Sequence, residues 1–239
     1  MAKYYRSKEN IIFDTVVVAL VVLVLVICLV PFMYVLSASF SGPKPLTNGE
    51  VFLFPKDFTL NAYVKIIQYP NFLRSYGNTI FYTVAGTAIC MVMTCLMAFP
   101  LAHSKLRGHG IFMKLVIVTM FFSGGMIPKY ILMSDLKLTN TRWSILLYGA
   151  IGISNLIIMR TYFINSIPSE LLEAARIDGI TDWGYLFRIV LPLSKTIMAV
   201  VAMYYAVGHW NSYFSAMMYL RDRELRPLQM VLRDILSSS

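Results

Sequence analysis

The stretch from Thr15 to Ser37, TVVVALVVLVLVICLVPFMYVLS, contains no charged residue and sets the strictest limit on how this chain folds. A helix needs about 20 apolar residues to cross the hydrocarbon core of a bilayer, and this stretch is long enough to cross with some tilt. It is far longer than the apolar region of a secretory signal, so we interpret it as a helix that stays in the membrane. Pro31 is expected to kink or thin its last turns.

The composition agrees with lipid as the main solvent. Hydrophobic residues make up 58% of the 239 residues and charged residues 14%, whereas soluble domains carry about 25% charged residues. Cys28, Cys90 and Cys95 all lie inside apolar runs, which argues against a disulfide framework and against a metal site. The net charge of +9 comes from bases scattered between apolar runs, as in loops that face lipid headgroups. We therefore expect membrane lipid as a partner and no nucleic acid.

Four further apolar runs follow the first. Together they predict an all-α, polytopic membrane bundle with five visible spans in a single domain over residues 1–239. The small residue Gly86 suits close packing between helices. The expected spans are residues 15–37, 77–102, 111–133, 144–163 and 193–218.

The third run is the least regular. Gly124, Gly125 and Pro128 fall within five residues and should break or end its helix. Irregular backbone at membrane depth is tolerated only where protein or a water-filled cavity surrounds it, so these residues could belong to a gate. The alternative is a helix that ends at the membrane interface, with the Lys129 side chain reaching the headgroups.

A charged segment, residues 164–192, separates the last two runs. Ser169 and Glu170 follow a proline, which is typical of a helix start, and Asp178-Gly179 is a strong turn pair. Thr181 is expected to cap a second short helix, and Pro192 to end it. Two short amphipathic helices around a sharp bend form either a docking surface or a plain connector, and these residues alone do not decide between them.

The same segment resembles a known family. EAARIDGITDWGYLFRIVLP is similar to the EAA signature of the membrane subunits of ABC importers, with Asp178 before the glycine as in the carbohydrate-uptake, maltose-type branch. FFSGGMIPKY, NLIIMRTYF and VGHWNSYF resemble a subgroup of that branch linked to complex oligosaccharides. The signature positions are Glu173, Ala174, Ala175, Gly179, Ile189, Leu191 and Pro192.

The resemblance implies a role for each part of this segment. In such permeases the loop is cytoplasmic and sits in a cleft of the ATPase subunit. Glu173 would pair with a basic residue there, Ala174 and Ala175 would permit close seating, and Gly179 would form the bend.

The resemblance also implies an assembly and an orientation. The partners would be a second homologous permease in a heterodimer, two ATPase subunits, an extracellular solute-binding protein and a carbohydrate substrate. The protein would lie in a bacterial cell membrane, with residues 1–14 on the cytoplasmic side. The charge distribution does not test this orientation: with the N-terminus inside, about half of the 21 Lys and Arg lie on each side, so the positive-inside rule decides nothing. The family usually has a sixth span, so we expect the sequence to be a C-terminally truncated fragment; a five-span permease is the alternative.

Polar and aromatic residues within the expected spans are candidates for the substrate path. Trp210 offers a ring face for a sugar, and Asn211 could bond hydroxyl groups. The alternatives are hydrogen bonding between helices and, for Trp210, a place in the interfacial aromatic belt. The candidates are Asn155, His209, Trp210, Asn211 and Tyr213.

No phosphate-binding loop of the G-x-x-x-x-G-K-[ST] type occurs in the sequence. We therefore expect no enzyme activity and no cofactor in this chain, with ATP and magnesium bound by the partner ATPase. An importer for another solute such as peptides, and a stand-alone carrier or channel, remain alternatives to a carbohydrate importer.

Overall fold

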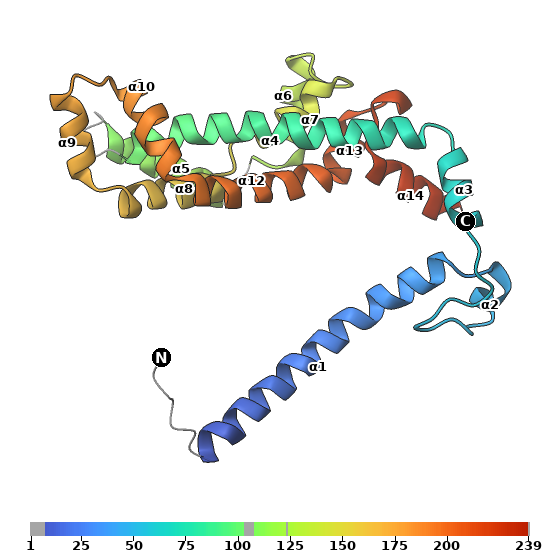
Figure 1. Ribbon diagram of the computed structural model, residues 1–239. Coiled ribbons are helices and arrows are strands. Elements are labelled where there is room, and N and C mark those ends of the chain that lie inside the picture. Colours follow the sequence, from blue (N-terminus) through green and yellow to red (C-terminus); the bar gives the residue numbers. More distant parts are fainter. Residues whose placement is uncertain (1–7, 103–107, 123, 239) are drawn as a thin grey trace. The chain divides into compact units, whose positions relative to one another are not determined.

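The computed structural model describes residues 8–102, 108–122 and 124–238, so residues 1–7 of the expected N-terminal segment lie outside it. The described part is mainly helical and contains no strand, which confirms the all-α fold (Figure 1). The chain divides into two compact units, Met1–Pro70 and Asn71–Ser239, and each is described by itself.

The first unit consists of one long helix and a small cap. Helix α1, Lys8–Ser39, continues through Pro31, and its most apolar window, with a mean hydropathy of 3.4, has no residue buried within this unit. The cap holds the short helices α2 (Pro43–Thr47) and α3 (Asn61–Gln68). It is fastened to α1 by the Ser37 hydroxyl, which donates to the Leu53 carbonyl at 2.6 Å.

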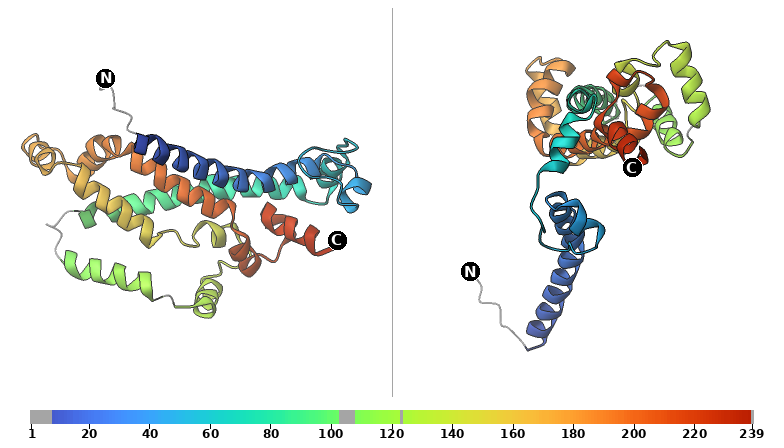
Figure 2. Two further views of the ribbon diagram at one scale, coloured as in Figure 1. Left: turned by 90° about the horizontal axis from the view of Figure 1, so that it is seen from below. Right: turned by 90° about the vertical axis from the view of Figure 1, so that its right-hand side faces the viewer.

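The second unit is built around α4, Phe72–Ala102, against which α8 (Ile153–Ser166) and α12 (Lys195–Trp210) pack, as seen in Figures 1 and 2. Buried residues recur every three or four positions along α4, so they form one face of the helix. Most of its side chains are small, which lets neighbouring helices approach closely. The buried face consists of Gly86, Cys90, Thr94, Ala98 and Leu101.

Two of the five expected spans are confirmed as single helices of sufficient length and apolarity, α1 and α4. Two bent pairs of helices could each supply a further span, so the described residues provide up to four. One pair is α5 (His109–Phe121) with α6 (Met126–Asp135), bent by 114°. The helix break expected here is confirmed at Gly124 and Gly125, where Gly125 has φ +82°, whereas Pro128 lies inside the first turn of α6.

The continuous helix expected over residues 144–163 is wrong. The structure has α7, Arg142–Leu146, then a non-helical segment, and only then α8, which has 14 residues. Gly149 in that segment has φ +70°, a conformation open to glycine but strained for other residues. The run over 193–218 is also divided, with α12 ending at Trp210 and α13 covering Tyr213–Tyr219.

The C-terminal segment is held against the first turns of α4. It comprises a 3₁₀ turn, Arg223–Leu225, and α14, Leu228–Ser238. Asn78 donates its amide hydrogens to the carbonyls of Glu224 and Arg226, at 2.7 and 3.2 Å. Figures 1 and 2 show α13 and α14 at one end of α4 and the charged loop with α9 and α10 at the other.

Candidate functional site

The charged loop folds as two helices around a glycine bend, as expected. Helix α9, Ser169–Ile177, ends in a motif in which Gly179, with φ +73°, donates to the Arg176 carbonyl at 3.1 Å. Ile180 donates to the Ala175 carbonyl at 2.8 Å, so both of these carbonyls near the end of the helix are satisfied. A side chain at Gly179 would be strained in this conformation, which makes the bend dependent on glycine.

The second helix starts where the sequence predicts but ends later. Thr181 caps α10, Asp182–Tyr185, by accepting a hydrogen bond from the Gly184 amide at 3.2 Å. The expectation that Pro192 ends this helix is wrong: a π-helical turn, Leu186–Val190, leads into α11, Leu191–Leu193, which contains the proline. A wider turn removes the need for the amide hydrogen that proline lacks. The chain turns at Ser194 instead, by 84°.

The signature residues divide between the loop surface and its own core. Glu173, Ala174, Asp178, Gly179 and Pro192 are exposed, and Ile189 and Leu191 are half-buried. Ala175 is only 3% exposed and belongs to the core that also contains Tyr185, Leu186 and Val190. We therefore correct one expectation: the side chain of Ala174 is available for a close approach by a partner, whereas that of Ala175 packs inside this chain.

A cavity of about 740 Å³ opens beside Glu173, between α9 and the adjoining ends of α4 and α8. Its apolar lining includes Phe99, Phe163 and Leu172. The charged residues of the lining come from the loop: Glu170, Glu173, Arg176 and Asp182. A lining that combines apolar and charged side chains suits contact with a protein partner.

The sequence missed two exposed aromatic residues in this loop. Trp183 and Phe187 belong to an apolar stripe that the helical period predicts, yet they are 62% and 57% exposed. Their rings stack at a centroid distance of 6.2 Å. Their spacing of four residues was the available signal, since residues four apart share one helix face.

A second site lies beside the break between α7 and α8. A pocket of about 420 Å³ is lined by aromatic residues and by His209 and Asn211. The His209 ring is buried against Gly86, and its Nε2 lies 3.4 Å from the Cys90 Sγ. The aromatic lining comprises Tyr148, Tyr204, Tyr205 and Phe214.

Only two of the five candidate substrate-path residues line this pocket. These two are His209 and Asn211. Asn155 is half-buried beside Gly152 and does not line the pocket. Trp210 makes an edge contact with Tyr76 at 6.2 Å. The Tyr213 hydroxyl donates to the Met217 sulfur at 2.9 Å.

The Tyr205 hydroxyl holds the irregular backbone of this site in place. It accepts a hydrogen bond from the Gly152 amide at 2.9 Å and pairs with the Thr94 hydroxyl at 2.7 Å. Replacing Tyr205 with phenylalanine leaves both groups without this partner, and we expect a loss of about 1–3 kcal/mol in stability. The thermal midpoint of the purified membrane protein measures this loss.

The matched control is Tyr162→Phe, because the Tyr162 hydroxyl makes only an exposed bond to the Leu193 carbonyl at 3.5 Å. We expect the midpoint of this variant to stay within experimental error of the wild type. Equal midpoints for the two variants would contradict the role assigned to Tyr205.

Within the described ranges no group of three histidine, cysteine or acidic side chains is placed to hold a metal ion. The loop offers charged side chains for docking, and the pocket offers aromatic and amide contacts.

Comparisons with known proteins agree on one family. Residues 70–228 match the family model described as binding-protein-dependent transport system inner membrane component. Protein LplC of Bacillus subtilis (strain 168) is 43% identical over 97% of this chain and 78% of its own length. The polygalacturonan/rhamnogalacturonan transport system permease protein YtcP of the same organism is 40% identical over 95% of this chain and 79% of its own.

A solved structure is similar over nearly the whole chain. It comes from the crystal structure of a bacterial ABC transporter involved in the import of the acidic polysaccharide alginate. The similarity has a TM-score of 0.91 at 35% identity and covers 98% of this chain and 83% of that one.

Proposed function

Because the chain belongs to the family of binding-protein-dependent transport system inner membrane components, we propose that it is the membrane-spanning permease subunit of an ATP-driven importer for carbohydrates. The observation that carries the proposal is the loop at one end of α4. It combines the complete EAA signature with an exposed helix, a glycine bend and a cavity that opens beside Glu173.

The relatives support a carbohydrate as the cargo. YtcP is named for polygalacturonan and rhamnogalacturonan transport, and a protein of Halalkalibacterium halodurans that is 27% identical is named for arabinooligosaccharides. Peptide import is not favoured by these similarities. A stand-alone carrier is not favoured either, since it would have no use for a docking loop of this design.

The exposed part of the loop is the proposed contact with the ATPase. Glu173 pairs with a base of that subunit, Ala174 permits a close approach, and Asp178 and Gly179 shape the bend that enters its cleft. The other signature residues act through the loop's own structure: Ala175, Ile189, Leu191 and Pro192 pack or guide the chain behind that surface.

The remaining parts of the assembly follow from this role. ATP and magnesium are bound by the ATPase subunits. This chain forms part of the translocation path and changes conformation when those subunits act. The loop and the N-terminus face the cytoplasm, a second homologous permease completes the path as a heterodimer, and a solute-binding protein docks outside. The pocket with His209 and Asn211 belongs to the path, and the break at Gly124, Gly125 and Pro128 to its gate.

Reconstitution of the complete importer tests the proposal. The chain is incorporated into proteoliposomes with its partner permease, ATPase subunits and binding protein, and uptake of labelled oligosaccharides and of oligopeptides is measured. We expect oligosaccharide uptake that requires ATP. Uptake of peptide alone would overturn the cargo class, and sugar uptake that persists without ATP would overturn the ABC mechanism.

A further inference from the structure

Two cations and three tyrosines form a connected cluster beside the pocket that contains His209. Lys129 lies over the Tyr148 ring at 5.9 Å, and Tyr148 packs on Tyr219 at 5.7 Å. Tyr219 stacks on Tyr130 at 6.1 Å, and Arg221 donates to the Tyr130 hydroxyl at 3.4 Å. Tyr148 also lines the pocket. We call these five residues the cation–tyrosine cluster.

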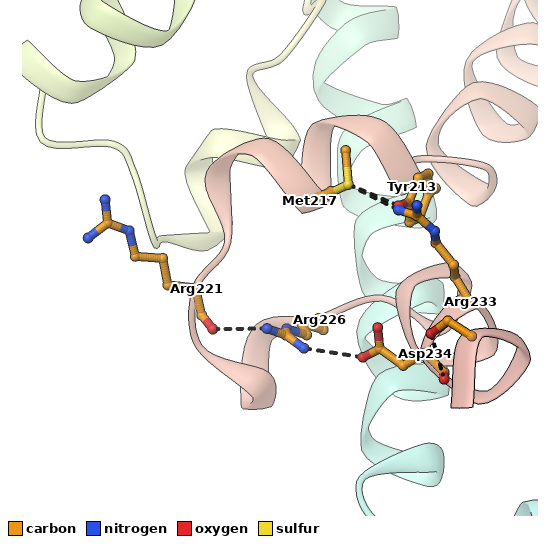
Figure 3. A network of polar contacts seen from close by, with 7 residues as sticks. Tyr213, Met217, Arg221, Arg226, Arg233 and Asp234 are labelled. Carbon is orange, nitrogen blue, oxygen red and sulfur yellow. Dashed lines mark hydrogen bonds and ion pairs between the residues drawn. The ribbon is translucent and has the colours of Figure 1, made fainter. Parts of the chain in front are cut away.

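Neither cation of the cluster is neutralised within the described part of the chain, where the ion pairs involve other bases. Arg226, close in sequence to Arg221, is paired with Asp234 at 3.3 Å. Figure 3 shows that the Arg221 guanidinium points away from this pair, while its backbone carbonyl accepts from Arg226. The carboxylate nearest in sequence, Asp222, accepts from the neutral amide of Asn140.

The end of the second unit that contains α13 carries more bases than is usual for the outward-facing side of a membrane protein. Tyr219 of the cluster belongs to α13, which Figures 1 and 2 show at the end of α4 opposite the charged loop. If that loop is cytoplasmic, as proposed above, this end faces outward, where membrane proteins are normally poorer in Lys and Arg. Bases nevertheless outnumber acids there: Arg74, Lys129, Lys137, Arg142, Arg221, Arg223, Arg226 and Arg233 against Asp135, Asp222, Glu224 and Asp234.

We propose that the cation–tyrosine cluster binds an anionic oligosaccharide, one that carries carboxylate groups such as uronic acids, on its way into the pocket. The half-buried rings of Tyr130 and Tyr148 offer apolar faces for the C–H surface of a pyranose, with the buried Tyr219 packed behind them, and the two cations pair with its carboxylates. Excess positive charge around a concave site also raises the local concentration of an anionic substrate. This inference rests on the proposed function for the outward placement and for the carbohydrate class.

The test measures direct binding to the assembled importer in nanodiscs, without the solute-binding protein. The probes are a galacturonic acid tetramer and its fully methyl-esterified form, which differ in charge. We expect the wild type to bind the acid form about tenfold more tightly at low salt, a ratio consistent with one or two exposed charge contacts, and to lose this preference as salt is raised.

The variant Lys129→Gln/Arg221→Gln removes both cations and should abolish the preference, so that the acid form and the ester are bound equally tightly. Arg223→Gln is the matched control, because it removes an exposed charge from the same end outside the cluster. Equal binding of the two probes by the wild type, or an undiminished preference in the double variant, overturns the inference.

One further outcome would assign the cluster to a protein partner and also overturn the inference. In that case the double variant would bind both probes as the wild type does but need more binding protein for half-maximal ATP hydrolysis. The result is separable from the proposed function, because binding of the acid tetramer does not require uptake. If the importer binds it selectively but no ATP-dependent uptake occurs, the proposed function fails and the binding site stands.

Discussion

Replacing Gly86 with valine is expected to destabilise the second unit by about 3 kcal/mol or more. A Cβ atom at this position would lie 2.6 Å from the His209 ring, and that ring is buried at the contact between α4 and α12. The ring belongs to a packed interface and has little room to move, so the two helices would have to separate. The thermal midpoint and the protease resistance of the purified protein measure the loss.

Gly77→Val is the matched control, since Gly77 lies in the same helix and a Cβ there would meet nothing within 4 Å. We expect it to leave the midpoint nearly unchanged, because valine is not a worse helix former than glycine. His209→Ala in the Gly86→Val background should restore part of the stability. Equal losses at Gly86 and Gly77 would refute the packing argument.

Replacing Glu173 with lysine is expected to abolish sugar-stimulated ATP hydrolysis in the complete importer. The carboxylate is exposed at the rim of the cavity beside α9, where it can pair with a base of the ATPase. Reversing its charge both removes that pair and places two cations together. We expect this to weaken binding of the ATPase by about 3–5 kcal/mol, which lowers its affinity more than 100-fold. Hydrolysis with saturating sugar and co-purification of the ATPase are the two measurements.

Glu170→Lys provides the comparison, since it makes the same charge change on the same helix and the same cavity. It lies outside the signature, so we expect hydrolysis to be reduced but still stimulated by sugar. Membrane insertion and the thermal midpoint should be unaffected in both variants. Normal stimulation in Glu173→Lys would refute the coupling role of this residue.

The charged loop was the part of the fold most open to prediction, because its signals are local. A glycine after Asp178 and a threonine before Asp182 specify a helix end and a helix start without help from the rest of the chain. The complete signature then identified the family. What the loop sequence could not tell was which alanine faces outward, since that depends on how α9 packs against Tyr185 and Leu186.

The break between α7 and α8 could not be predicted because its cause is not local. The run over residues 144–163 is apolar enough to suggest one helix, and hydropathy averages over any interruption. The structure satisfies the Gly152 amide with the hydroxyl of Tyr205, which lies 53 residues further along the chain. The same limit applies to the pocket, because its wall needs residues from both sides of that break.

The short helices of the second unit have a consequence for how the protein is made. With a rise of about 1.5 Å per residue, the 14 residues of α8 and the 16 of α12 cover about 21 and 24 Å, less than the roughly 30 Å of a bilayer core. Neither helix is long enough to span that core by itself, whereas α1 and α4 are. We expect α4 to insert first and to provide the surface on which the helices synthesised after it pack. The order of synthesis then contributes to folding.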